Sequence, residues 1–147
     1  MKRDEILNQL EKLIHLDIDA TEAYDQAIRN IDEQVIKDKL ILFKGDHRKH
    51  VELLSAKMIE MGGKPPEFTP DFKGFFITGF TALRSMTGTK GALNAMESNE
   101  KLTNSRYEDA SKLEMPSDIA AIIRSNLADE QHHLSFIREA LTTLARK

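Results

Sequence analysis

The sequence places acidic and histidine side chains inside apolar stripes, at spacings that would bring several metal-binding groups together. Along residues 36–61, apolar residues recur every three or four positions, and His47 and His50 occupy two positions of that stripe. A second stripe further along the chain contains Glu130 and His133. Because residues three or four apart lie on one helix face, each pair points to one side. Carboxylate and imidazole ligands without sulfur suit iron, manganese or zinc.

A repeat relates these residues to two further carboxylates. Asp17 and Glu100 interrupt apolar stripes elsewhere in the chain, and they lie 83 positions apart. Aligning each residue with the one 83 positions later runs without a gap from residue 10 to residue 60. Few residues are identical, but one offset superimposes the helices, the turns and the unusual polar positions together. Asp46 and Asp129 are identical repeat mates, and we expect them to hold the ligands from behind.

The repeat predicts that six ionisable side chains meet at about one height. Asp17 lies 30 residues before His47, and Glu100 lies 30 residues before Glu130, so antiparallel hairpins would align them. An unpaired buried charge costs several kcal/mol, so such a cluster must be neutralised by mutual pairing, protonation or a metal. The candidate metal ligands are Asp17, His47, His50, Glu100, Glu130 and His133.

Four helical segments would have to hold these residues. Apolar residues recur with helical periodicity in residues 4–31, 32–61, 90–113 and 116–145, and no segment carries a strand pattern. Asp32 is a candidate N-cap for the second helix, and the glycine pair after Met61 is a candidate stop. Three of the four prolines fall in the loop that follows.

This pattern predicts an all-α protein with one domain, residues 1–147. One hairpin would span residues 4–61, a crossover residues 62–89 and a second hairpin residues 90–145. Two helical hairpins joined by one long crossover form the ferritin-like variant of the four-helix bundle. The phenylalanines of residues 72–80 favour a crossover packed on the bundle, with a homodimer surface or a hydrophobic entrance as the alternatives.

Composition excludes several other classes of function. The 21 basic and 24 acidic residues give a net charge of −3, so no basic field indicates nucleic acid. No apolar run approaches the roughly 18–20 residues that span a bilayer. The absence of cysteine excludes disulfides, thiol catalysis, cysteine-ligated zinc and iron–sulfur clusters. We expect a soluble cytoplasmic protein, because the charged N-terminus carries no signal-peptide pattern.

The candidate ligands resemble those of the ferritin-like di-iron carboxylate superfamily. In that superfamily, two helices each supply a carboxylate and the other two each supply Glu-x-x-His. The segment LADEQHHLSFI, with Glu130 and His133, matches this motif. The whole chain also resembles a group of ferritin-like bacterial proteins of roughly 150 residues and unknown function, which share the Gly-Gly loop, the aromatic crossover and a helix carrying Glu100 and Tyr107.

The resemblance implies a di-iron site, with two departures from the family pattern. Glu130 would bridge two ions, His50 and His133 would be nitrogen ligands, and Asp17 and Glu100 would be terminal carboxylates. Asp17 stands where the family has Glu, which shortens its reach. His47 also stands where the family has Glu, which removes one bridge and lowers the ligand charge from −4 to −3. A looser dinuclear site or a mononuclear site would follow.

Two hypotheses of function follow. The first is a metal-binding ferritin-like protein, in its most specific form a di-iron oxidase or peroxidase of a stress response, with iron as the leading metal and manganese or zinc as alternatives. The second is a metal-free, non-catalytic structural or interaction protein, in which His47 and His50 bond to Glu100 and Glu130. Outside the six ligands, we expect Glu97 to be a reserve ligand. We expect His15 and His132 to be surface or supporting residues. Tyr24 and Tyr107 should be core residues whose hydroxyls are hydrogen-bonded.

Overall fold

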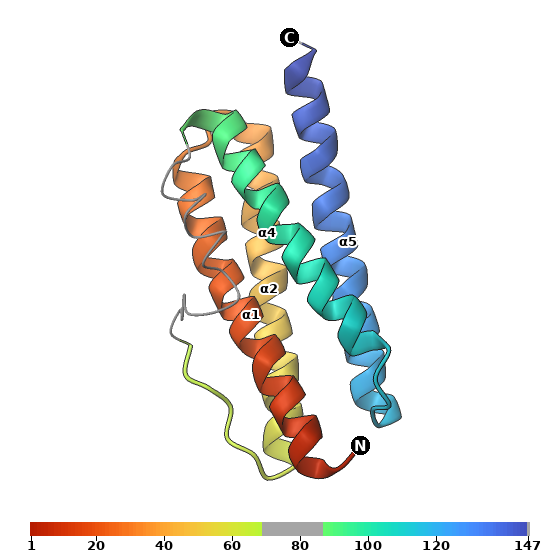
Figure 1. The fold of residues 1–147 in the computed structure, drawn as a ribbon. Coiled ribbons are helices and arrows are strands. Elements are labelled where there is room, and N and C mark those ends of the chain that lie inside the picture. The colour runs from red at the N-terminus through yellow and green to blue at the C-terminus, as the bar shows by residue number, and fades with distance from the viewer. Residues whose placement is uncertain (69–86, 147) are drawn as a thin grey trace.

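The computed structural model describes residues 1–68 and 87–146, and these residues contain four long helices. Figure 1 shows how the helices are arranged. They are α1 (Arg3–Arg29), α2 (Gln34–Glu60), α4 (Gly88–Ser111) and α5 (Ser117–Ala145). Helices α1 and α2 pair as one hairpin and α4 and α5 as the other, while α1 packs on α4 and α2 on α5. No strand occurs among the described residues, so the predicted all-α bundle is confirmed.

The first hairpin ends at the glycine pair that the sequence identified as a stop. Gly62 has a positive φ of 80°, a left-handed conformation that strains residues with a Cβ atom. The backbone N–H of Gly63 donates to the carbonyl of Met58 at 2.8 Å, which satisfies a carbonyl at the end of α2. A Cβ atom on Gly63 would lie 2.7 Å from a methyl group of Leu7, so α1 packs closely here.

The prediction that Asp32 caps the second helix is wrong. Glu33 occupies the N-cap position of α2, and its side chain makes no capping hydrogen bond. The backbone N–H of Asp32 instead donates to the hydroxyl of Thr89 at 3.0 Å. The short turn is therefore tied to the start of α4, which begins at Gly88, two residues earlier than predicted.

Two apolar clusters fill the bundle, one on either side of a polar layer. The first includes Leu10, Ile123 and Tyr107. The second includes Leu40, Leu93 and Tyr24. Each helix therefore carries apolar residues toward both ends of its buried face and polar residues in the middle. The apolar residues stabilise the bundle, and the polar residues lie between the two clusters.

None of the described helices is long and apolar enough to cross a membrane. The phenylalanine-rich segment at residues 72–80, and with it the middle of the predicted crossover, lies outside the described residues.

Candidate metal centre

The structure brings all six predicted residues together in the polar layer. Helix α1 supplies Asp17 and α4 supplies Glu100, while α2 and α5 each supply two residues three positions apart. Every one of the six is between 0 and 1% exposed, so all are removed from water. The six are Asp17, His47, His50, Glu100, Glu130 and His133.

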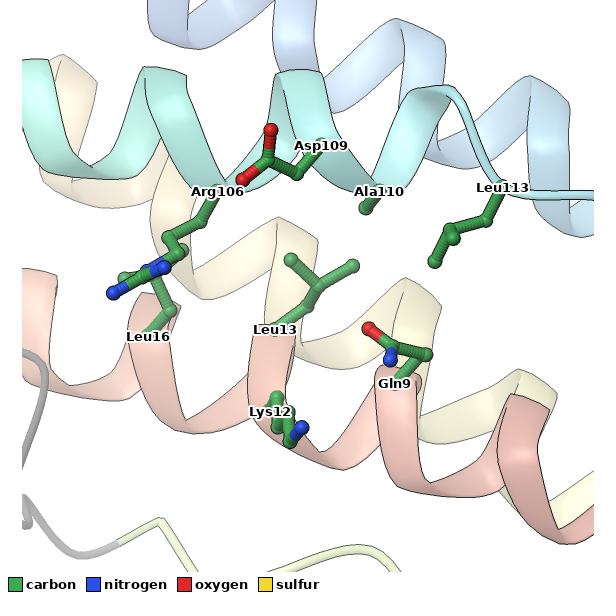
Figure 2. A pocket seen from close by; sticks show the side chains of 8 residues that line it. All are labelled: Gln9, Lys12, Leu13, Leu16, Arg106, Asp109, Ala110 and Leu113. Atoms are coloured by element: carbon green, nitrogen blue, oxygen red, sulfur yellow. The ribbon is translucent and has the colours of Figure 1, made fainter.

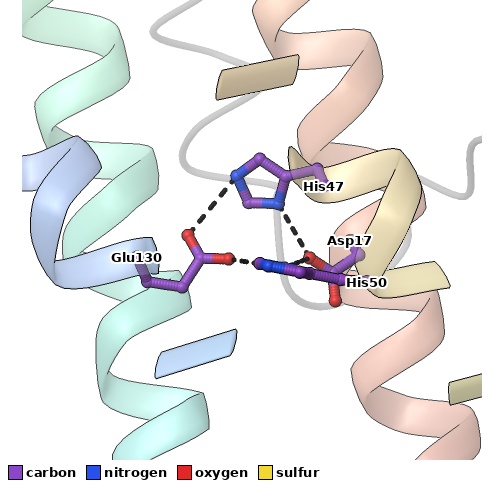
Figure 3. A group of neighbouring side chains, drawn as sticks. All are labelled: Asp17, His47, His50 and Glu130. Atoms are coloured by element: carbon purple, nitrogen blue, oxygen red, sulfur yellow. Dashed lines mark hydrogen bonds and ion pairs between the residues drawn. The ribbon is translucent and has the colours of Figure 1, made fainter. Parts of the chain in front are cut away.

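Four of these residues form a first group of ligand atoms that lie within 4.8 Å of one another. Asp17 Oδ1 lies 2.7 Å from Nδ1 of His47 and 3.1 Å from Nδ1 of His50. Glu130 Oε1 approaches Nδ1 of His50 at 3.3 Å from the opposite hairpin. Figure 3 shows the two rings between the carboxylates of Asp17 and Glu130.

A second group lies on the other side of His47 and Glu130 and meets the same 4.8 Å limit. His47 Nε2 lies 3.1 Å from Glu100 Oε1 and 3.4 Å from Glu130 Oε2. His133 Nδ1 lies 3.4 Å from the same Glu130 oxygen and 3.6 Å from Glu100 Oε1. The two groups therefore share His47 and Glu130, and each contains carboxylate and imidazole ligands only.

Two aspartates hold the rings from behind, as the sequence predicted. Nε2 of His50 lies 2.8 Å from Asp129, and Nε2 of His133 lies 2.8 Å from Asp46. These contacts leave Nδ1 of each ring facing the centre, which is the arrangement that fixes a metal-binding histidine. Asp46 and Asp129 are 40% and 44% exposed, so the carboxylates lie where the centre meets solvent.

The two buried tyrosines hold the carboxylates of the opposite hairpin. Tyr24 donates its hydroxyl proton to Glu100 at 2.7 Å, and Tyr107 donates to Asp17. Asn126 in turn donates to the Tyr107 hydroxyl at 3.3 Å. Burial of the phenol raises the pKa of both tyrosines well above its ordinary value, and the nearby carboxylates add to this, so both remain protonated donors.

Two polar residues of α4 support the centre without having been assigned a role from the sequence. Thr103 Oγ1 lies 3.0 Å from Glu100 Oε2 and 3.3 Å from Glu130 Oε2. The amide of Asn104 donates to the backbone carbonyls of Glu100 and Glu130, at 2.8 and 3.0 Å. Thr103 interrupts an apolar stripe one turn after Glu100, and that interruption is the signal that could have identified it.

Opposite charges dominate the protonation of the three histidines. Burial alone would lower the pKa of His47, but the charge of Glu130 and the hydrogen bonds to Asp17 and Glu100 raise it to about 9. The same competition raises the pKa of His50 to about 11 and that of His133 to about 12. The rings are therefore stabilised as cations when no metal replaces their protons.

The three carboxylates respond differently to the same environment. Burial would raise the pKa of Asp17 and Glu100, but their histidine partners outweigh it and lower both values. Burial raises the pKa of Glu130, and the negative charge of Glu100 adds to this effect. Glu130 is thus the carboxylate whose charge is least compensated by the protein itself.

Two polar atoms at the centre have no hydrogen-bond partner in the described part of the chain. They are Oε1 of Glu130 and Nδ1 of His133. Each lies within ion-pair distance of a group opposite, but not in the alignment that a hydrogen bond requires. Buried polar atoms are rarely left unpaired; a cation in the first ligand group would satisfy Glu130 Oε1, and a cation in the second would satisfy His133 Nδ1. The residues present therefore fit a bound transition metal.

The other candidate residues lie outside this cluster. Glu97 accepts a long hydrogen bond of 3.4 Å from Arg138 instead of facing the centre. His15 lies 3.8 Å from Glu11 on the same helix, and His132 is exposed and contacts the ring of Phe43. These placements agree with the expectation that neither histidine is a direct ligand.

A surface groove of about 260 Å³ lies between α1 and α4 (Figure 2). Leucine side chains form much of its lining, and Lys12, Arg106 and Asp109 also line it. None of the six clustered residues lines this groove. The groove is thus separate from the candidate metal centre.

Comparison with known proteins supports the fold. Residues 5–113 match the family described as "Domain of unknown function (DUF2383)". No curated protein matches the chain. A solved structure described as a dodecameric thioferritin, the bacterioferritin-related protein from Bacteroides fragilis, has a TM-score of 0.80 at 16% identity. The similarity covers 99% of this chain and 89% of that chain.

A second solved structure has a similar fold. It is described as a ferritin-like, diiron-carboxylate protein from Bacillus anthracis str. Ames, with a TM-score of 0.76 at 19% identity. The similarity covers 96% of this chain and 99% of that chain. At such low identity the similarity shows the fold alone, and it confirms the ferritin-like four-helix bundle predicted from the sequence.

Proposed function

The chain belongs to the family described as "Domain of unknown function (DUF2383)". From the geometry of the buried centre, we propose that the protein binds a transition metal. The observation that carries this proposal is the pair of four-atom ligand groups that share His47 and Glu130. The unpaired atoms of Glu130 and His133 support it, since a cation in the ligand group to which each atom belongs would satisfy that atom.

Iron is the first choice of metal. Imidazole and carboxylate ligands suit iron, manganese and zinc, and the two ligand groups contain no sulfur. The similar protein from Bacillus anthracis is described as a diiron-carboxylate protein, which favours iron among the three. Manganese and zinc stay as alternatives, because the same ligand atoms accept both.

We extend the proposal to oxidase or peroxidase chemistry with O₂ or H₂O₂, as part of a stress response. Bound iron would supply the redox chemistry. The chain itself would supply position and shielding: Asp46 and Asp129 orient two rings, while Tyr24 and Tyr107 hold two carboxylates. The apolar clusters on both sides keep water from the centre.

Metal content tests the ligand assignment directly. Protein purified without a histidine tag should contain stoichiometric metal, and the double variant His50→Ala/His133→Ala should contain none. Glu97→Gln is the matched control, because Glu97 pairs with Arg138 outside the centre. Unchanged metal in the double variant would show that the ligands are wrong. Consumption of O₂ or H₂O₂ by iron-loaded protein, absent from the double variant, would support the oxidative role.

A metal-free structural or interaction protein is the second candidate, and one observation favours it. His47 faces both Asp17 and Glu100 at hydrogen-bond distance, so part of the network satisfies itself. Thermal melts in chelator and in added iron, manganese or zinc separate the candidates. Metal binding to the folded state alone stabilises it by about 2.7 kcal/mol at a hundredfold excess over Kd. No shift in any metal would favour the structural role.

The cytoplasmic location and the homodimer expected from the sequence stay predictions. The similar Bacteroides fragilis protein is described as dodecameric, which supports self-association of this chain in some form. Size-exclusion chromatography with light scattering, on protein with and without metal, measures the oligomeric state.

A further inference from the structure

The three histidines of the centre differ in how many ring nitrogens they leave for a metal. His50 and His133 each direct Nε2 to an outer aspartate at 2.8 Å, so only Nδ1 faces the ligands. His47 faces ligands on both sides: its Nδ1 lies 2.7 Å from Asp17, and its Nε2 lies 3.1 Å from Glu100. His47 therefore presents one nitrogen to each ligand group, and Figure 3 shows the nitrogen that faces Asp17 in the first group.

Glu130 is the other side chain that both groups share. Its Oε1 faces His50 at 3.3 Å, and its Oε2 faces His47 and His133 at 3.4 Å each. A carboxylate carries lone pairs on both oxygens at once, so Glu130 can contact an ion in each group. A neutral imidazole has one nitrogen with a free lone pair and one N–H, so His47 cannot.

We propose that His47 makes the two groups compete, so that an ion bound in one group weakens binding of a second ion in the other. With an ion in the first group, Nδ1 binds it and Nε2–H donates to Glu100. With an ion in the second group, Nε2 binds it and Nδ1–H donates to Asp17. A second ion must displace the remaining ring proton to solvent or forgo His47 as a ligand. This inference rests on the proposed metal binding.

The charge of the ligand set supports the same conclusion. Two divalent cations would bring four positive charges to the three carboxylates of Asp17, Glu100 and Glu130, all of them buried. Among the buried groups one positive charge would then be in excess, which is costly, and the aspartates behind the rings, Asp46 and Asp129, are 40% and 44% exposed and so screened by solvent. A single divalent cation would leave one net negative charge on the three carboxylates. The N–H groups of the histidines in the vacant group can hydrogen-bond to that charge.

Titration with Co²⁺ tests the competition, because its absorption reports on coordination and it has the same kind of ligand preference. We expect wild-type protein to bind one Co²⁺ per chain tightly and the second at least about 100-fold more weakly, within the range of coupling between sites in proteins. His47→Glu supplies two oxygens, so its two affinities should lie within about tenfold of each other. His47→Gln offers one acceptor and one donor, and it should keep the wild-type pattern.

Single ligand variants give a second measurement that does not depend on His47→Glu folding. His50→Ala disables the first group and His133→Ala the second, so each variant should still bind one Co²⁺ tightly. Two equally tight ions in the wild type would overturn the competition, as would a folded His47→Glu variant that keeps the wide gap. No binding of Co²⁺ by the wild type would overturn the proposed function itself, which is a distinguishable failure.

Discussion

Asp46 in the first hairpin holds His133 of the second, with 2.8 Å between Oδ2 and Nε2. The reciprocal contact joins Asp129 of the second hairpin to His50 of the first, also at 2.8 Å. The aspartates and histidines are repeat mates 83 residues apart. The repeat is therefore visible in the hydrogen bonds as well as in the helices, and each hairpin depends on the other to orient its histidine.

Removing both outer carboxylates should weaken metal binding about 10–100-fold. The double variant Asp46→Asn/Asp129→Asn keeps an oxygen acceptor at each position but loses the charge that orients and polarises the ring. Each single variant should lose at most a few-fold, because the opposite group still holds the tight ion. The measurement is the affinity for the first Co²⁺.

The control for this double variant is Asp38→Asn on the same helix. Asp38 is exposed and accepts a hydrogen bond from Gln34 at 2.7 Å, away from the centre. The metal affinity of the Asp38→Asn variant should equal that of the wild type. Similar losses in the control and the double variant would contradict the orienting role of Asp46 and Asp129.

Metal-free protein should lose stability as the pH rises from about 7 to about 10. Burial opposes the cationic form of His47, but Glu130, Asp17 and Glu100 raise its pKa from 6.5 to about 9. A histidine whose pKa is higher in the folded state contributes stability that is fully present below pH 6.5 and lost as the pH passes about 9. The difference corresponds to on the order of 3 kcal/mol.

Thermal melts in chelator at pH 7 and pH 9.5 measure this loss. His47→Gln removes the titrating ring, so its melting temperature should change less over the same interval. Added metal should have the opposite pH dependence, because binding requires unprotonated rings and strengthens as protons become scarce. A wild-type melting temperature that rises with pH in chelator would refute the cationic network.

Tyr107→Phe should destabilise the metal-free protein more than Tyr24→Phe does. Tyr107 is the donor to Oδ2 of Asp17 in the described chain, and its hydroxyl also accepts from Asn126. Glu100, the partner of Tyr24, keeps contacts with His47 and Thr103 after the hydroxyl is removed. Leaving a buried acceptor unpaired costs about 1–3 kcal/mol. Urea denaturation of both variants in chelator gives the comparison, and equal losses would contradict it.

Substitution of two glycines by alanine should change the free energy of unfolding in opposite directions. Gly62 has φ of 80°, so Gly62→Ala should cost about 1 kcal/mol of unfolding free energy. Gly45 lies inside α2, and a Cβ atom there meets nothing within 4 Å, so Gly45→Ala should stabilise by about 0.5–1 kcal/mol. Urea denaturation measures both. Metal content should stay at the wild-type level in Gly45→Ala, since the added methyl group lies in open space.

The height of the buried side chains followed from sequence spacing because the helix has a fixed rise per residue. Asp17 and His47 lie 30 residues apart in the sequence, on either side of a short turn, and the structure places Asp17 Oδ1 2.7 Å from His47 Nδ1. The same arithmetic aligned Glu100 with Glu130 in the second hairpin. Asp46 and Asp129 were identifiable because the repeat preserves them among few other identities.

Side-chain direction was not predictable in the same way. Spacing placed His47 and His50 on one face, but it did not show that His47 directs both nitrogens inward while His50 directs one to Asp129. Those directions depend on how the two hairpins dock. The cap of α2 was mispredicted for a similar reason, because the backbone of Asp32 bonds to Thr89, a residue distant in sequence.

The crossed contacts between the hairpins have a consequence for how such a centre could arise and change. Two separate, identical hairpins associating about a twofold axis would make every cross-hairpin bond twice, but they would carry the same residue at both shared positions. A single chain is free of that constraint, and here it combines His47 in one half with Glu130 in the other. Fusion of two equivalent halves thus permits an asymmetric centre, in which one shared side chain can serve two ions and the other must choose.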